Sequence, residues 1–111
     1  AAPPLRIFAC NAFGHPPAVL AYARAVEAHA ERFGHAPLDA AIGALRALRK
    51  AVPAAAETLY WEGRCQEAAG RPARAAVPYR RLLAAGHAAP ARLGREAASR
   101  LALLPPNPAA T

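Results

Sequence analysis

The side chains that could do chemistry are few and are spread along the chain. Asp39 is the only aspartate and Ser99 the only serine, so the sequence offers no Ser/His/Asp set for nucleophilic catalysis. The four histidines lack the paired spacing, such as HExxH, that binds a metal. A glycine-rich phosphate loop and a Cys-x-x-Cys-His haem motif are absent from the sequence. We therefore predict that the protein is not an enzyme and has no metal site and no cofactor.

The two cysteines, Cys10 and Cys65, do not have the spacing of a metal site. They form either one disulfide, in an oxidising compartment, or two buried thiols. The chain opens with Ala-Ala-Pro-Pro and no methionine, which indicates that an N-terminal signal has been removed. We expect an extracytoplasmic, periplasmic location, with the cytoplasm as the alternative.

Tyr60 and Arg64 are the residues best suited to binding another protein. They are one helical turn apart, so a partner could contact an aromatic ring and a guanidinium together. Trp61, the only tryptophan, lies beside them in the sequence. The alternative is that the two aromatic rings belong to the core and that Arg64 is solvated.

The chain is strongly basic, with 14 lysines and arginines against seven carboxylates and a formal net charge of +7. This balance favours acidic partners, nucleic acid or anionic surfaces, although a GC-rich genome would produce the same composition. Two cationic clusters could form a stripe on the outer helices. Aromatic residues are not interleaved with these cations, so nucleic acid ranks below protein as the partner. The stripe would contain Arg46, Arg49 and Lys50 together with Arg80 and Arg81.

A length of 111 residues suits one domain, and the abundant alanine, leucine and arginine favour helix. Prolines and glycines divide the chain, and apolar residues recur at spacings of three and four between them. An apolar, irregular lead-in over 1–15 and a flexible Pro-rich tail over 105–111 flank a helical domain over 16–104. No run of 18 apolar residues exists, so we expect no transmembrane segment. The predicted helices cover 16–33, 37–50, 54–69, 72–85 and 90–104.

The sequence matches itself at a shift of 34 residues. In that register Ala41 aligns with Ala75, and Leu48 with Leu82. The segment ETLYWEGRCQEAAGRPARAAVPYRRLL resembles a tetratricopeptide repeat, a family with this period. It has Leu59, Gly63, Gly70, Ala75, Tyr79 and Leu82 at the spacings of that family. We therefore predict an all-α fold, with two tetratricopeptide-like helix pairs and a C-terminal capping helix in a short right-handed α-solenoid.

The resemblance also implies a function and a site. In tetratricopeptide stacks the first helix of each pair lines a concave groove that binds other proteins. The implied function is a protein–protein interaction or scaffold module. It would be an accessory subunit that contacts a larger assembly, in solution or at a membrane surface, through this face or the apolar lead-in. The implied groove residues are Glu57, Tyr60, Arg64 and Glu67 in the second unit, Val26, Ala30 and Phe33 in the first, and Arg95 in the last helix, with Trp61 beside them.

Overall fold

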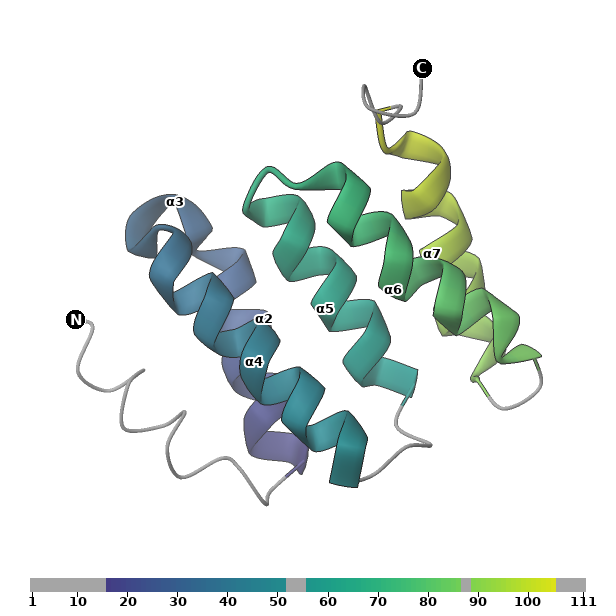
Figure 1. Cartoon of the computed structure of the whole chain (residues 1–111), viewed down its shortest axis with the longest axis horizontal. Helices are drawn as coiled ribbons and strands as arrows, with labels where there is room; N and C mark the ends of the chain where they lie inside the picture. The colour runs from purple at the N-terminus through teal and green to yellow at the C-terminus, as the bar shows by residue number, and fades with distance from the viewer. Residues whose placement is uncertain (1–15, 52–55, 87–88, 106–111) are drawn as a thin grey trace.

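The computed structural model describes residues 16–51, 56–86 and 89–105, and within these ranges the chain is all-helical, without a strand. The predicted lead-in over 1–15 and nearly all of the predicted tail lie outside the described residues. The helices are, in chain order, α2 (Pro16–Ala28), α3 (Ala30–Phe33), α4 (His35–Ala51), α5 (Ala56–Ala68), α6 (Pro72–Ala84) and α7 (Ala91–Leu103) (Figure 1).

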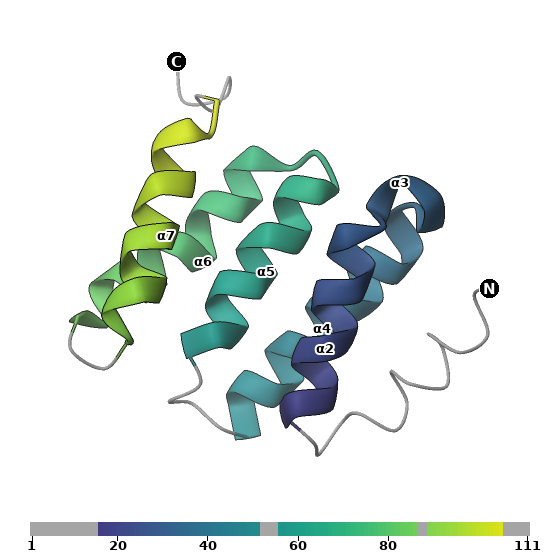
Figure 2. The same cartoon turned by 180° about the vertical axis from the view of Figure 1, so that it is seen from behind.

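Helix α5 lies at the centre of the stack and packs against α2, α4, α6 and α7. Helices α4 and α6 flank it on the face seen in Figure 1. On the opposite face, seen in Figure 2, α2 and α7 flank it. The antiparallel pairs α2–α4 and α5–α6 are thus stacked side by side, with α7 on the outer side of α6. The prediction of an all-α, solenoid-like stack with a terminal helix is confirmed.

The prediction of one continuous helix over 16–33 is wrong in one respect, because the helix is interrupted at His29. This residue has φ −118° and ψ 28°, outside helical values, and separates α2 from the single turn of α3. The centroids of the His29 and Phe33 rings lie 6.2 Å apart in a T-shaped arrangement, and α3 packs on α4. Packing against α4 therefore redirects the last turn, against the local preference for one continuous helix.

The other helix boundaries agree with the predictions to within two residues, except that the predicted start at 54 lies outside the described residues. Helix α4 begins at His35, two residues before Pro37, because a proline in the first turn lacks only an N–H that has no helical acceptor. Gly34 and Gly70 follow α3 and α5 with φ of +77° and +74°. Only glycine adopts this left-handed backbone at little cost, which explains the stops at both positions. Helix α6 continues through the buried Pro78.

The buried side chains form two clusters. The first lies between α2, α4 and α5 and includes the fully buried Leu38 and Leu45. The second lies between α5, α6 and α7 around Tyr79, and Trp61 packs against both clusters. A buried leucine stabilises the fold by roughly 1.5–3 kcal/mol relative to an exposed one. The two clusters therefore hold α5 in place from both sides.

Helices α5 and α6 cross closely at Gly63. A Cβ atom built on Gly63 would lie 2.6 Å from Cζ of Tyr79, well inside van der Waals contact. Tyr79 is itself fully buried. The glycine at this position, which the resemblance to a tetratricopeptide repeat singled out, is thus required by the ring that packs over it.

Candidate functional site

A hollow of about 400 Å³ lies between α5 and α7. Three of the residues predicted for the concave groove come together there, namely Tyr60, Arg64 and Arg95. The sequence did not point to the other four. The complete lining is Tyr60, Arg64, Arg95, Glu96, Ser99, Arg100 and Leu103.

The resemblance implied that Tyr60 presents its ring to a partner, but the structure buries the ring instead. It is only 4% exposed and belongs to the core cluster around Tyr79. Its hydroxyl accepts a hydrogen bond of 2.8 Å from Nη1 of Arg64. Tyr60 is buried because α7 packs over the α5 face that a longer groove would leave open.

Arg64 is held by the protein itself. Its Nε and Nη2 atoms donate to Oε1 of Glu27 on α2, at 3.2 and 2.7 Å. Its guanidinium lies 5.2 Å from the Trp61 ring centroid, within the range of a cation–π contact. Burial lowers the pKa of Arg64, but the hydrogen bonds to Tyr60 and Glu27 outweigh it and leave the pKa raised. Arg64 is therefore a fixed positive charge on the floor of the hollow.

Glu67 links three helices. Nε of Arg100 donates to its Oε2 at 2.8 Å and Nη2 of Arg100 to its Oε1 at 3.3 Å, while the hydroxyl of Tyr79 donates to Oε2. Burial raises the pKa of Tyr79, and the bond to the Glu67 carboxylate raises it further. The pKa of Arg100 is also raised, chiefly by its hydrogen bond to Glu67. Glu67 thus connects α5 to α6 and α7 rather than reaching toward a partner.

Other residues predicted for the groove differ in location and exposure. Glu57 is exposed in the first turn of α5 and does not line the hollow. Trp61 is half-buried between the two core clusters. Val26, expected on the groove surface, is fully buried, because the α2 stripe that carries it faces α4 and α5. Arg95 is exposed and forms no ion pair with any residue in the described ranges.

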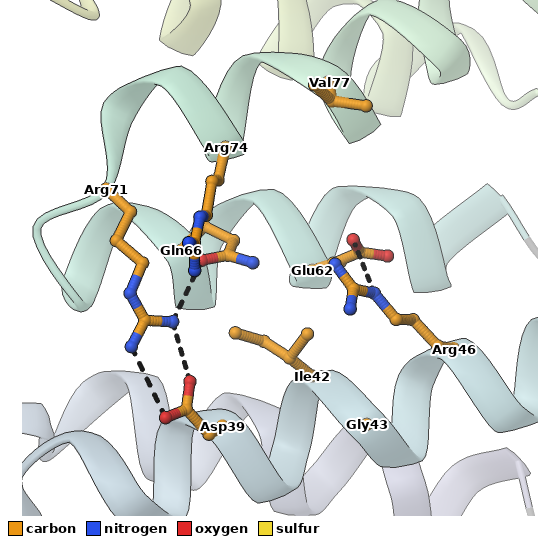
Figure 3. Close-up of a pocket in the computed structure, with 9 residues that line it drawn as sticks. All are labelled: Asp39, Ile42, Gly43, Arg46, Glu62, Gln66, Arg71, Arg74 and Val77. Carbon is orange, nitrogen blue, oxygen red and sulfur yellow. Dashed lines mark hydrogen bonds and ion pairs between the residues drawn. The ribbon is translucent and has the colours of Figure 1, made fainter.

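The predicted basic stripe forms in part, on the other face. Arg46, Arg49, Lys50 and Arg81 line one depression beside Leu59, whereas Arg80 does not. Arg46 also lines an adjoining depression, shown in Figure 3, between α4, α5 and α6. The sequence did not suggest the other residues of this second depression, which are Asp39, Ile42, Gly43, Glu62, Gln66, Arg71, Arg74 and Val77.

Glu62 is the buried charge of this face. Only 6% of its side chain is exposed, and it pairs with Nε of Arg46 at 3.3 Å and with Nη1 of Arg49 at 2.7 Å. The Arg49 contact is electrostatic, because neither of its two atoms makes an aligned hydrogen bond. Asp39 and Arg71 form a second pair, at 2.7 Å (Figure 3). The pKa of Asp39 is lowered, first by the hydrogen bond from Arg71. Both carboxylates are thus already engaged by arginines.

Cys65 is a free, fully buried thiol whose Sγ lies 3.8 Å from the carbonyl oxygen of Ala23. Burial, together with the nearby Glu27 carboxylate, raises its pKa from 9.0 to about 12. Of the two alternatives for the cysteines, Cys65 shows the buried thiol, while Cys10 lies outside the described residues.

Within 16–51, 56–86 and 89–105, no group of three or more potential metal ligands occurs. None of the helices in these ranges has the length and apolar character needed to cross a membrane. No protein-family model, curated protein or solved structure matches the chain.

Proposed function

We propose that this protein is a small tetratricopeptide-like adapter that binds a segment of a partner protein in the hollow between α5 and α7. The observation that carries the proposal is that two exposed side chains of α7, Arg95 and Leu103, both line the hollow. Arg95 is exposed without an ion pair in the described residues, and Leu103 is 81% exposed. Arginine is enriched at the energetic centres of protein interfaces, and an exposed leucine gains free energy when a partner buries it.

The floor of the hollow supports the same proposal. Arg64 and Arg100 are held by Glu27 and Glu67, so their positions are set before a partner arrives. Preordered side chains lose little conformational entropy on binding. A partner segment with one apolar side chain for Leu103 and one carboxylate for Arg95 fits this surface best.

The test begins with the partner. Affinity-tagged wild-type protein is used to capture partners from the native source, and mass spectrometry identifies them. The purified partner is then titrated against wild type, against the Arg95→Glu/Leu103→Ser variant and against an Arg32→Glu/Leu83→Ser control. The control makes the same chemical changes at exposed residues outside the hollow.

We expect the hollow variant to bind at least about tenfold more weakly, on the order of 2 kcal/mol, and the control to bind within about twofold of wild type. Equal affinity of wild type and the hollow variant would contradict the proposal. Failure of wild-type protein to retain any partner would contradict it as well.

A further inference from the structure

The two adjoining depressions on the α4–α6 face form one surface, the outer groove. Helices α4 and α6 make its sides and α5 its floor (Figure 3). Along α4 it extends from Asp39 to Lys50, which at 1.5 Å per helical residue is about 17 Å. An extended peptide of roughly five residues covers this length. The groove shares no lining residue with the hollow between α5 and α7, so it is a separate surface.

The outer groove has an excess of positive charge that the fold does not use. Its two carboxylates, Glu62 and Asp39, are paired with arginines. Three further cations form no ion pair with any described residue. Two of them lie on one face of α6, seven residues apart. These three are Lys50, Arg74 and Arg81.

Two apolar side chains lie in the groove. Ile42 of α4 is only 4% exposed, whereas Val77 of α6, which lies between Arg74 and Arg81 in the sequence, is 53% exposed. Figure 3 shows Ile42 between α4 and α5 and Val77 on α6. A ligand that matches this pattern carries an apolar group in the middle and negative charges on either side.

Gly43 is an unusual residue for its place in the groove. It lies in the middle of α4, where glycine destabilises a helix relative to alanine. A Cβ atom built on it would meet nothing within 4 Å, so packing inside the chain does not require glycine here. The missing side chain leaves the α4 backbone open to close approach from the groove.

We propose that the outer groove binds an extended acidic segment of another protein, with an apolar side chain against Val77 and carboxylates near Lys50, Arg74 and Arg81. A peptide fits the groove better than nucleic acid does. No aromatic side chain lines the groove for base stacking. This inference goes beyond the adapter function and does not depend on it.

Fluorescence anisotropy tests the inference with a labelled acidic peptide, EELEELE, and its neutral counterpart QQLQQLQ. We expect wild-type protein to bind the acidic peptide and not the neutral one. The Arg74→Glu/Arg81→Glu variant should bind at least about tenfold more weakly. The control Arg24→Glu/Arg92→Glu has the same net charge but is changed at exposed residues outside the groove, so it should stay within about twofold of wild type.

A second pair of variants tests the location without changing the charge. Gly43→Gln places a side chain in the groove and should weaken peptide binding at least about tenfold. Gly94→Gln makes the same change near the start of α7, where there is also open space, and should bind like wild type. The Arg95→Glu/Leu103→Ser variant should also keep peptide binding, so failure of the adapter proposal and failure of this one are distinguishable. Circular dichroism checks that every variant remains helical.

Several results would overturn the inference. Wild-type protein that fails to bind EELEELE rules it out. Equal losses in the two charge-reversal variants would indicate unspecific attraction, and a Gly43→Gln variant that binds normally would place the peptide elsewhere. A 12-nucleotide oligothymidylate that displaces the labelled peptide at a lower concentration than unlabelled peptide does, and that binds the groove variants equally weakly, would show that the groove binds nucleic acid instead.

Discussion

At the scale of single residues, several polar side chains predicted to bind a partner bind other residues of the protein instead. Arg64 serves Glu27 and Tyr60, and Glu67 serves Arg100 and Tyr79. The residue types that made these positions attractive for partner binding also make them effective links between helices. The cations that remain without ion pairs in the described ranges, such as Arg95 and Arg74, are the ones available to other molecules.

Gly63 provides a prediction at this scale. Replacement by alanine brings a Cβ to within 2.6 Å of Cζ of Tyr79, and the fully buried ring has no free space to move into. We expect Gly63→Ala to destabilise the fold by about 1–3 kcal/mol despite alanine's better helix propensity. Thermal unfolding measures the change, with Gly94→Ala as a matched control. The control should raise the melting temperature, because its Cβ meets nothing within 4 Å. An unchanged melting temperature in Gly63→Ala would refute the close crossing.

At the scale of elements, the helices are joined by charged pairs as well as by apolar packing. Glu27 of α2 meets Arg64 of α5, and Glu67 of α5 meets Arg100 of α7. Glu62 of α5 meets two arginines of α4. Helix α5 thus supplies a charged partner to three neighbouring helices, which suits its central position.

The Glu62 pairs give a second prediction. In Glu62→Gln the shape is kept, but Arg49, whose side chain is 16% exposed, loses the carboxylate 2.7 Å away. Leaving a largely buried cation without its counter-charge costs about 1–3 kcal/mol, so the midpoint of urea unfolding should fall. Asp39→Asn is the matched control, since Asp39 is 54% exposed and its pair with Arg71 contributes at most about 1 kcal/mol. Equal losses in the two variants would contradict the assignment of Glu62 as the buried link.

At the scale of the whole molecule, stability depends on groups that are buried in their neutral form. Burial raises the pKa of Cys65 from 9.0 to about 12, and it also raises the pKa values of Tyr22 and Tyr79. Below pH 9 these groups are neutral in both the folded and the unfolded chain. Above pH 9 the unfolded chain loses protons that the folded chain retains, so rising pH favours unfolding.

The resulting prediction is alkaline destabilisation. The free energy of unfolding should stay level from pH 7 to 8.5 and then fall, with Cys65 contributing up to about 1.4 kcal/mol per pH unit between pH 9 and pH 12. Urea unfolding at a series of pH values measures it. A Cys65→Ala variant should show a shallower fall between pH 9 and pH 10, before the tyrosines of the unfolded chain ionise. The same slope in wild type and variant would remove Cys65 as the cause.

Local features of the sequence determined the helices and their buried stripes. Glycines with positive φ, prolines in first turns and apolar residues at spacings of three and four act within one or two helical turns, so they can be recognised without the fold. The resemblance to a tetratricopeptide repeat singled out Gly63 and Tyr79, which the structure brings into close contact. Only the break at His29, where α3 packs on α4, needed tertiary contacts.

Tertiary structure alone decided which polar residues bind one another within the chain and which stay exposed. The ion pairs join residues far apart in the sequence: Arg64 and Glu27 are 37 positions apart, and Arg46 and Glu62 are 16 apart. No spacing rule predicts such pairs, because they depend on how helices from different parts of the chain stack. The same stacking buried Tyr60 under α7 and opened the outer groove between α4 and α6. A charge or a ring becomes a binding site only where the packed helices leave it without a partner of its own.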